Sequence, residues 1–515
     1  MPSANRAVLR IASASGSVTD RRGGFADLAL HEDVDFIIGD WMSEYNMTMR
    51  GGSKADSNSS SSEYEECFLE SIEPALTALA TNKIKVAVNA GASDTEKLYH
   101  ALSEMVKNKG LDLKIAWVGG DEVSDVVQAA IKSGESFQSL TTGKNISEWG
   151  YEPIYAQCYL GCWGIVEAFN AGADISVPTY VTGGNFSGFK SLPGKSLSLS
   201  FPILEIESDG TFVVTKQSGR DGMVTIDTCK AQLLYEIQGP YYYNSDVVAD
   251  LTNIKIESMG QDRVKVSNIG FRKPPPTTKV GMTAKGGFQA EVHYFACGLD
   301  IEEKAALLER QVRNALDVSR YHTLKFRING SCPSNPSNQD AATVDFRIFA
   351  QAKEESALSA SNFLRPCTDV IMQSYPGATF AVDARQAFPK PYYEYWVALL
   401  PQSSAKHEVH LPFTGKTIAI SAPTDTEEFL YAQPTYETPN PVAMGSWGPT
   451  TVAPIGYVVH ARSGDKGSDA NVGFFVRNPD EWDWLRSILT VQQVQKMLGD
   501  DFEGSPIMLL RSEPR

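Results

Sequence analysis

Short apolar runs alternate with amphipathic stretches over the first third of the chain. Four runs have the length of buried strands, and three longer stretches have the apolar spacing of helices. The predicted strands are Val8–Ala12, Val34–Ile38, Lys85–Asn89 and Ile115–Val118, and the predicted helices are Cys67–Ala80, Thr95–Lys107 and Val123–Ser133. Asp94 is placed to cap the helix that begins at Thr95. This order indicates β-α-β units and therefore a parallel sheet with flanking helices.

Polar residues and glycines follow each of the four predicted strands. The segments are Ser13–Asp20, Asp40–Glu44, Asn89–Gly91 and Gly119–Asp121. Right-handed crossovers place the carboxyl ends of parallel strands on one edge of the sheet, where open α/β sheets bind ligands. For any one loop, ordinary turn chemistry is the better interpretation, because Gly, Asn and Asp are common turn residues. Four such loops in succession favour a site.

The pattern changes in the middle third of the chain, where hairpin signals predict an α+β extension. Before this part, within the first third, residues 51–63 are rich in Ser and Gly and are predicted to be a mobile loop. The further predictions are a helix at Tyr159–Asn170, hairpin turns at Asp209-Gly210 and Gly260 with a helix at Thr228–Ile237 between them, a helix at Ile301–Leu316, and strands at Thr323–Ile328 and Ala342–Ala350.

Residues 401–451 are rich in Pro, Thr and Ser, which predicts a linker in which His407 and His410 are solvated. A small α+β domain is predicted over residues 452–515. Its elements are strands Gly456–Ala461 and Asn471–Arg477 and helices Glu481–Leu489 and Val491–Leu498. The loop Arg462–Asp469 between the strands could hold a phosphate or carboxylate, or it could equally be a charged turn in which Asp465 pairs with a neighbouring cation.

Composition narrows the classes of function. The chain has 515 residues and a formal charge of −16, and dispersed negative charge disfavours nucleic acid and anionic membrane as partners. No signal peptide is visible, and no apolar run approaches the roughly 18 residues of a membrane span, so a cytoplasmic location is expected. The seven cysteines are too widely spaced for a disulfide framework. Cys158 and Cys162 lack a second ligand pair nearby, so a metal site is not expected. The chain also has no Walker loop and no G-x-G-x-x-G motif, and no cofactor is expected.

Several longer motifs carry a family resemblance over nearly the whole chain. They are IASASGSVTDRRGGF, VDFIIGDWMSEYNMTM, KVAVNAG, YLGCWGIVEAFNAGADI, YVTGGNFSGF, LLYEIQGPYYYNSDVVADLTNIKI and HARSGDKGSDANVGFF. With these motifs the chain resembles the acyclic terpene utilisation family, and YVTGGNFSGF and WDWLRSILT look like its fungal branch. The resemblance implies an α/β domain over residues 1–400, a smaller C-terminal domain, and a link to catabolism of acyclic terpenoids such as citronellol and geraniol through CoA thioesters.

The chain departs from the family pattern in three places. Asp174–Pro178 runs straight into Thr179–Gly184, where the family carries several tens of further residues with a G-R-V-x-D segment and an H-x-I-E-C-like element. The family's N-A-G-G-x-N-P is Asn89–Asp94 here, and the family's terminal domain continues beyond the closing IMLLRSEPR. Two explanations fit these gaps. The first is an incorrect gene model, with intron boundaries misplaced at Val177/Pro178 and near Ser505, and the second is a genuine truncated paralogue that is catalytically impaired. The first is favoured, because losing a strand–loop–helix unit would uncover apolar faces.

The resemblance and the four loops together predict a hydratase or lyase acting on a CoA thioester or terpenoid, a small-molecule substrate. Such chemistry needs a carboxyl group for proton transfer and donors for a developing enolate. The predicted catalytic residues are Asp20, Asp40, Glu44 and Asp121; the predicted substrate-binding residues are Ser15, Gly16, Asn89, Gly91, Gly119, Gly120, Thr182, Gly183, Gly184, Arg462, Ser463, Gly464, Asp465, Lys466 and Asn471. Each acid could instead be an ordinary cap or ion pair. The alternatives are a ligand-binding or regulatory protein and an assembly scaffold, and a homo-oligomer stays open.

Overall fold

The computed structural model describes residues 8–56, 62–177, 198–237, 239–430, 437–438, 440–466 and 469–510. Within these ranges the side chains of Glu236, Met444, Asp465 and Lys466 are not described. The chain divides into two compact units. The first comprises residues 1–149, 155–282 and 396–515, and the second comprises residues 150–154 and 283–395. Residues 1–400 contribute to both units, and the domain bounds predicted from the sequence stay a prediction.

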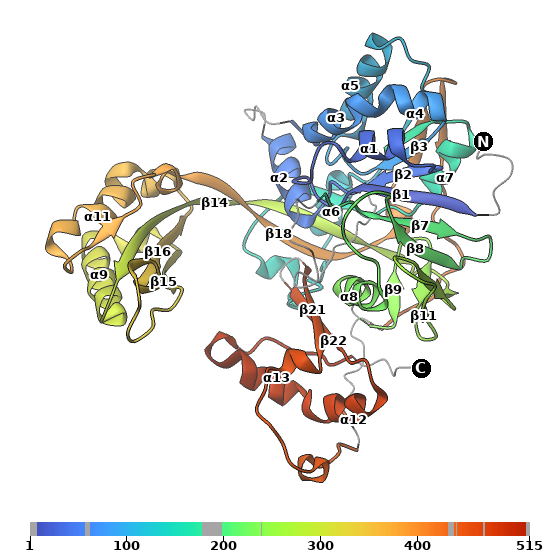
Figure 1. Cartoon of the computed structure of the whole chain (residues 1–515). Helices are drawn as coiled ribbons and strands as arrows, with labels where there is room; N and C mark the ends of the chain where they lie inside the picture. The colour runs from blue at the N-terminus through green and yellow to red at the C-terminus, as the bar shows by residue number, and fades with distance from the viewer. Residues whose placement is uncertain are drawn as a thin grey trace. The chain divides into compact units, whose positions relative to one another are not determined.

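The first unit is built on a mixed sheet whose central strands are parallel (Figure 1). Among the described residues the strand order is β11-β12-β8-β7-β1-β2-β3-β6-β4-β19-β20. The parallel strands are β1 (Leu9–Ser15), β2 (Phe36–Gly39), β3 (Lys85–Val88), β6 (Ile175–Val177) and β4 (Ile115–Gly119). This confirms the parallel sheet and the four strands predicted from the first third of the sequence.

Helices cover both faces of the parallel strands. The helices among residues 8–177 are α1 (Gly24–His31), α2 (Glu44–Ala55), α3 (Glu66–Ile72), α4 (Leu76–Asn82), α5 (Thr95–Asn108), α6 (Ser124–Lys132) and α7 (Trp163–Asn170). Helix α6 is not one of those that cover the parallel strands, because Val127 packs in a separate core with Val280 and Trp396. Helices α1, α3, α4 and α5 pack their apolar sides on one face, where Phe25 stacks on Trp41. Helix α7 lies on the other face, where Phe169 contacts Phe36 edge to face. The strands are thus buried on both sides, which explains their continuous apolar runs.

Local signals account for several helix boundaries. Asp94 caps α5 as predicted, since its carboxylate accepts from the backbone N–H of Lys97 at 2.9 Å. The single helix predicted at Cys67–Ala80 is instead α3 and α4, separated by a short 3-10 turn that contains Pro74. Proline has no backbone N–H to donate within a helix, which accounts for the break.

Antiparallel hairpins extend the same sheet rather than forming a separate α+β layer. Strands β7 (Pro202–Ile206) and β8 (Phe212–Lys216) join at the predicted Asp209-Gly210 turn, and β7 pairs with β1. Strands β11 (Lys255–Ser258) and β12 (Val264–Ser267) form the second predicted hairpin, and β12 pairs with β8. The hairpin signals were local, whereas the choice of neighbouring strand depends on tertiary packing.

The linker prediction for residues 401–451 is wrong over part of its length. Strands β19 (Glu408–Leu411) and β20 (Lys416–Ala419) form a hairpin, and β19 pairs antiparallel with β4. His410 stacks on Trp117 with 3.7 Å between ring centroids, and burial lowers the pKa of His407 to about 4. Neither histidine is the freely solvated side chain that the composition predicted.

Two other local predictions are corrected by the structure. Gly51–Ala55 belong to helix α2 and not to a loop, and residues 57–61 lie outside the described residues. The helix predicted at Tyr159–Asn170 begins only at Trp163, because β5 (Pro153–Cys158) and a short connection precede it.

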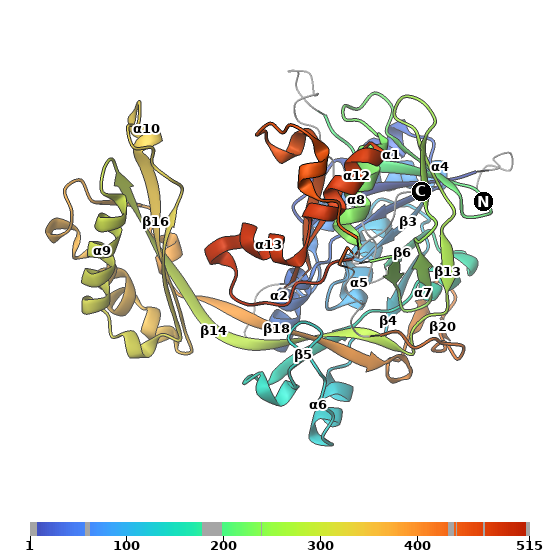
Figure 2. The same ribbon diagram turned by 90° about the horizontal axis from the view of Figure 1, so that it is seen from below.

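A second sheet runs through the 21-residue strand β14 (Thr277–Cys297). It has the order β15-β16-β14-β17, with β5 and β18 (Lys390–Pro401) also paired to β14; Figure 2 shows β14 and β18 side by side. The second unit contains β15 (Thr323–Asn329), β16 (Thr343–Ala352), β17 (Thr379–Phe380), α9 (Ile301–Ala315), α10 (Gln339–Ala342) and α11 (Arg365–Thr368). Its core forms between α9 and alternate residues of β16, so the predicted helix and strands are confirmed.

The terminal segment is a strand pair followed by two helices. These are β21 (His460–Lys466), β22 (Asp469–Phe475), α12 (Pro479–Ile488) and α13 (Val491–Leu498). Strand β21 therefore includes Arg462–Lys466, which the sequence predicted as a loop. The remaining elements are α8 (Ile226–Glu236) and a small sheet of β9 (Tyr241–Tyr243), β10 (Val248–Asp250) and β13 (Gly270–Arg272).

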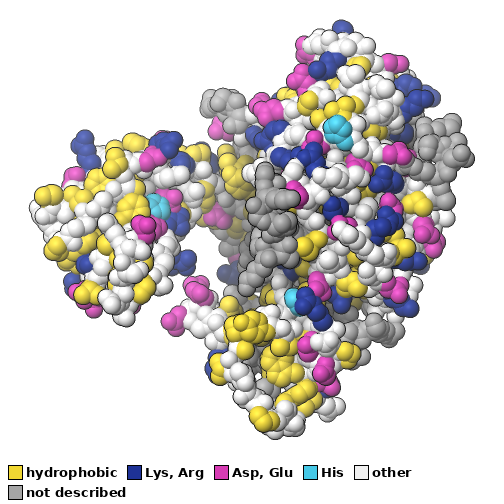
Figure 3. All heavy atoms as spheres, in the orientation of Figure 1, with side chains coloured by type: hydrophobic (Ala, Val, Ile, Leu, Met, Phe, Trp, Pro, Cys, Tyr) yellow, Lys and Arg dark blue, Asp and Glu magenta, His cyan; other side chains and the backbone are white. Residues whose placement is uncertain are grey.

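Charged side chains of both signs are interspersed over the face shown in Figure 3. Charged side chains of the described residues also form ion pairs, such as Arg263 with Glu205 at 2.5 Å. No described helix is long and apolar enough to cross a membrane.

Candidate active site at the carboxyl edge of the parallel sheet

The loops after β1, β2, β3 and β4 all leave the same edge of the sheet, because these strands are parallel. Two polar clusters lie along this edge. The first, here the Asp40 cluster, comprises Ser15, Asp20, Asp40, Glu44, Asn89 and Tyr159. The second, here the Asp121 cluster, comprises Lys54, Ser93, Asp121, Glu122, Tyr155 and Gln157.

Asn89 orients Asp40 in the first cluster. The Asn89 Nδ2 donates to Asp40 Oδ1 at 2.6 Å, and Asn89 Oδ1 accepts from the Trp41 backbone N–H at 2.6 Å. Asn89 is fully buried. Both ends of its amide therefore contact the protein, and Asn89 holds the carboxylate that follows β2 in one orientation. The predicted role of Asn89 as a donor to substrate stays a prediction.

Asp20 closes the loop that follows β1. Its Oδ2 accepts from the backbone N–H of Gly16 at 2.7 Å and from the Ser15 hydroxyl at 3.2 Å. The backbone N–H of Asp40 in turn donates to the Ser15 carbonyl at 3.0 Å. These are the hydrogen bonds of an ordinary turn, and they explain Asp20 without a catalytic role.

Glu44 and Asp40 share a neighbour that sequence analysis did not identify. Burial, together with the negative charges of Glu44 and Asp40, raises the pKa of the Tyr159 hydroxyl. This phenol therefore stays protonated at neutral pH and is able to donate a hydrogen bond. Tyr159 follows β5, and nothing in the local sequence distinguishes it from an ordinary apolar residue.

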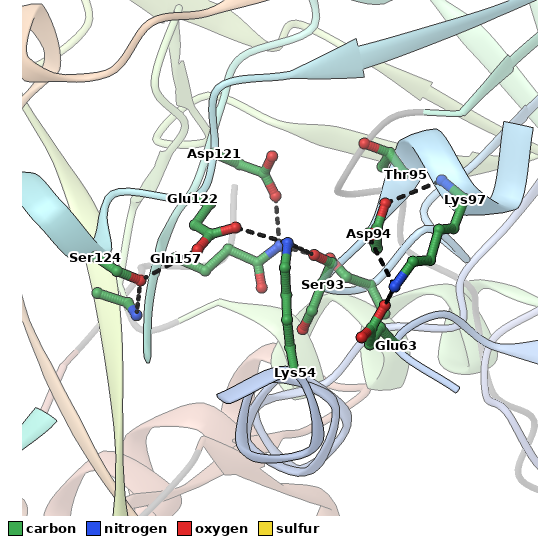
Figure 4. A network of polar contacts seen from close by, with 12 residues as sticks. Lys54, Glu63, Ser93, Asp94, Thr95, Lys97, Asp121, Glu122, Ser124 and Gln157 are labelled. Atoms are coloured by element: carbon green, nitrogen blue, oxygen red, sulfur yellow. Dashed lines mark hydrogen bonds and ion pairs between the residues drawn. The ribbon is translucent and has the colours of Figure 1, made fainter. Parts of the chain in front are cut away.

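Asp121 is the most perturbed acid of the second cluster. It is only 7% exposed, and burial raises its pKa to about 6 although Gln157 donates a hydrogen bond to its carboxylate. Gln157 Nε2 also donates to the Ala92 carbonyl at 2.7 Å, so Gln157 connects β5 to the loops after β3 and β4. Figure 4 shows Asp121 and Gln157 facing each other in this network. A carboxyl group with a pKa near neutrality can both accept and return a proton.

Lys54 ties helix α2 to the same cluster. Its ammonium group lies 2.7 Å from Glu122 Oε2 and donates to the Ser93 carbonyl at 2.7 Å (Figure 4). Arg50, which also belongs to α2, donates a hydrogen bond at 2.7 Å to the buried carboxylate of Glu65. These contacts fix α2 along the carboxyl edge, which places Glu44 at one end of the helix and Lys54 at the other. Sequence analysis missed Lys54 because it assigned residues 51–63 to a loop.

The predicted glycines at the edge are required by close packing. A Cβ added to Gly120 would lie 1.8 Å from the Lys406 carbonyl oxygen, and the φ of Gly120 is +96°. A Cβ on Gly91 would lie 2.2 Å from Thr95 Cγ2, and one on Gly119 would lie 2.7 Å from the Trp117 ring. These contacts explain the glycines without a ligand, and backbone donation from Gly119 and Gly120 to substrate stays a prediction.

Three of the predicted binding residues of the terminal segment, Arg462, Gly464 and Asn471, contact helix α8. The Arg462 guanidinium lies over the Tyr235 ring at 4.9 Å, and Asn471 Nδ2 donates to the carbonyls of Leu234, Tyr235 and Ile237 at 3.0–3.1 Å. A Cβ on Gly464 would lie 2.7 Å from Tyr235, so glycine permits this close approach. Asn471 thus terminates α8 and holds the strand pair against it.

Three of the remaining predicted residues, Thr182, Gly183 and Gly184, lie outside the described residues. The side chains of Asp465 and Lys466 are not described either, and Ser463 is exposed. At the far end of the strand pair, burial raises the pKa of Asp469 and the charge of Lys279 opposes that shift. The Lys279 carbonyl accepts from the backbone N–H of Tyr159 at 3.0 Å. The strand pair therefore reaches the neighbourhood of the Asp40 cluster through Lys279.

Replacing Asn471 with Ala should loosen the β21–β22 pair from α8. The substitution removes three hydrogen bonds to carbonyls at the end of a helix, and we expect a loss of roughly 1–3 kcal/mol in local stability. Hydrogen exchange of α8 and β22 should accelerate at least fivefold. Ser463→Ala, an exposed change on the partner strand, is the control. Equal exchange in both variants would show that Asn471 does not hold the strand pair.

Among the described residues, no group of three or more His, Cys, Asp or Glu side chains is arranged to hold a metal ion. The arrangement at the edge is instead one of carboxylates, amides and hydroxyls, which suits proton transfer.

Comparison with known protein families accounts for most of the chain. The family model described as acyclic terpene utilisation family protein AtuA matches residues 9–179 and 176–411. The model described as AtuA ferredoxin-like domain matches residues 453–509. No curated protein and no solved structure matches the chain. The first match comes in two pieces that meet at residues 176–179, at the end of β6.

Proposed function

The chain belongs to the acyclic terpene utilisation family, and on this premise we propose that it hydrates an unsaturated acyclic terpenoid carried as a CoA thioester, or catalyses the reverse elimination. One observation carries the proposal: a buried carboxyl group, Asp121, has a pKa of about 6 at the ligand-binding edge of an α/β sheet. Acids with a pKa near the working pH are effective at giving and taking protons.

The reaction needs one group that moves a proton in both directions. In the hydration direction, the Asp121 carboxylate takes a proton from water while the water oxygen bonds to the β-carbon of the substrate. The π electrons move to the thioester carbonyl and form an enolate. The enolate then takes the proton back from Asp121 at the α-carbon. The sum is addition of water across the double bond, without any oxidant or reductant.

The Asp40 cluster supplies the polar groups that this enolate requires. Tyr159 stays protonated and can donate to a carbonyl oxygen, which is the requirement for stabilising negative charge as it develops. Asp40 is held rigidly by Asn89, so it can orient a hydroxyl or a water near the same edge. We therefore assign Asp40 to positioning within the site and Asp121 to proton transfer.

A ligand-binding paralogue without activity is the second candidate. The family match comes in two pieces that overlap at residues 176–179, and β6 lies between β3 and β4 among the parallel strands. Residues that the family places after β6 would therefore leave the sheet at the edge that carries Asp121. If transcripts restore coding sequence at this junction, the enzyme is favoured. If they do not, binding of acyl-CoA without turnover favours the paralogue.

Replacing Asp40 with Asn should lower turnover of the true substrate at least tenfold. The neutral amide keeps the size of the side chain but removes the negative charge that faces Asn89 and Tyr159. The measurement is kcat/KM for the most active thioester in a panel of branched unsaturated acyl-CoA substrates. Asp112→Asn is the control, because Asp112 is exposed before β4, at the opposite edge of the sheet. Unchanged turnover in Asp40→Asn would remove Asp40 from the site.

A further inference from the structure

Three buried polar atoms of the Asp121 cluster have no hydrogen-bond partner among the described residues. They are Ser93 Oγ, the Tyr155 hydroxyl and Gln157 Oε1. The three side chains belong to residues that are 5%, 2% and 2% exposed. Leaving one such atom unsatisfied costs roughly 1–3 kcal/mol, so three in one cluster indicate a bound polar group.

The three atoms belong to neighbouring side chains. Tyr155 and Gln157 are two positions apart on strand β5, so their side chains point to the same face of the sheet. Gln157 donates to the carbonyl of Ala92. Because Ser93 directly follows Ala92 in the chain, Gln157 lies beside Ser93. The hydroxyls of Tyr155 and Ser93 are close enough to interact, although no hydrogen bond of good geometry joins them. Figure 4 shows Ser93, Gln157 and Asp121 within one network.

The chemistry of this set selects a neutral group that both donates and accepts. Gln157 Oε1 can only accept, whereas the two hydroxyls can donate or accept. The ammonium group of Lys54 already contacts Glu122 and the Ser93 carbonyl, so its charge is balanced within the cluster. A buried water makes about three hydrogen bonds to groups of this kind.

We propose that Ser93, Tyr155 and Gln157 form a binding site for one hydroxyl oxygen, that of the water which adds to the substrate beside Asp121. In the reverse direction the same site holds the hydroxyl group that leaves the substrate. The inference rests on the proposed hydration, because Asp121 accepts the proton of this water. The water oxygen bonds to the β-carbon, and the proton passes through Asp121 to the α-carbon, so all atoms are accounted for.

The test separates water addition from proton abstraction. Proton abstraction is followed as deuterium uptake at the α-carbon of a saturated branched acyl-CoA in D2O, a reaction that needs Asp121 but no added water. Hydration is followed with the α,β-unsaturated acyl-CoA of the same chain. The variants are Tyr155→Phe and Ser93→Ala, with Tyr99→Phe on α5 and Ser133→Ala after α6 as matched controls.

We expect Tyr155→Phe and Ser93→Ala each to lower hydration at least thirtyfold while changing deuterium uptake less than threefold. Asp121→Asn should abolish both reactions, and the two controls should change neither. Equal losses of both reactions in Tyr155→Phe, or unchanged hydration, would overturn the proposed water site.

A second measurement keeps the two proposals separate. If the natural protein catalyses neither reaction, the proposed function fails, and a high-resolution crystal structure then judges the binding site by itself. An ordered water within hydrogen-bonding distance of Ser93 Oγ, the Tyr155 hydroxyl and Gln157 Oε1 supports the site. Density that shows these three atoms bonded to one another, with no water between them, contradicts it.

Discussion

Replacing Asp121 with Asn should lower kcat/KM at least hundredfold and, at the same time, make the folded protein more stable at pH 8. The amide has nearly the size of the carboxyl group and can still accept from Gln157, but it cannot take a proton from water. The expected loss follows from removing the only group to which the proposed mechanism assigns proton transfer. A variant with more than a tenth of the natural activity would contradict that assignment.

The gain in stability follows from the raised pKa of Asp121. In the folded protein this pKa is about 6, against 3.8 for an ordinary aspartate, because burial disfavours the charged form. Protonated Asp121 makes its full contribution to the free energy of unfolding below pH 3.8, and this contribution is lost as the pH rises through 6. Above that range the buried charge costs roughly 2–4 kcal/mol, which a neutral Asn would recover.

The measurement is urea unfolding of the natural protein and of Asp121→Asn at pH 4 and pH 8. The two proteins should have similar free energies of unfolding at pH 4, and the variant should be the more stable one at pH 8. Asp112→Asn, an exposed change, should show no such dependence on pH. A difference of the same size at both pH values would mean that Asp121 is not the titrating group.

Replacing Gly120 with Ala should destabilise the first unit by more than roughly 3 kcal/mol, the range of severe core substitutions. Two effects add at this position. The φ of +96° is strained for any residue with a Cβ, and the new Cβ would lie 1.8 Å from the Lys406 carbonyl oxygen. The Lys406 carbonyl belongs to the backbone and cannot rotate away from the new Cβ as a side chain could. The segment before β19 would therefore have to move away from β4.

Gly134→Ala is the matched control for this experiment. Gly134 has a φ of +97°, and no atom lies within 4 Å of its added Cβ. Its cost should be only the backbone strain, roughly 1 kcal/mol. The comparison is made by urea unfolding of both variants. If Gly120→Ala proves no more costly than Gly134→Ala, the contact with Lys406 does not hold the strand.

The candidate site was predictable where it depends on local order along the chain. Asp40, Asn89 and Asp121 each follow an apolar strand, and parallel strands bring such residues to one edge whatever the rest of the fold does. Gln157 and Tyr155 were not predictable in this way. They follow no strand end, and Gln157 meets Asp121 across 36 residues and Ala92 across 65.

The terminal segment shows the limit of reading residue types alone. Asn471 and Arg462 have the donors that an anion site requires, and the sequence could not distinguish a ligand from the end of a helix as their partner. The structure places the α8 carbonyls within 3.0–3.1 Å of Asn471 Nδ2. The partner is more than 230 residues away along the chain, so only the tertiary contact reveals it.

By itself, the sequence determined the strands β1, β2, β3 and β4, the helices α5 and α6, the Asp94 cap and the two hairpin turns, because each depends on side chains a few residues apart. Only the tertiary structure decided that β7 pairs with β1, that β19 pairs with β4, and that Lys54, Tyr155 and Gln157 join Asp121. Strand edges accept any strand of fitting register, and burial of a carboxyl group depends on every element packed around it. Such choices are made by the whole fold, and no local pattern records them.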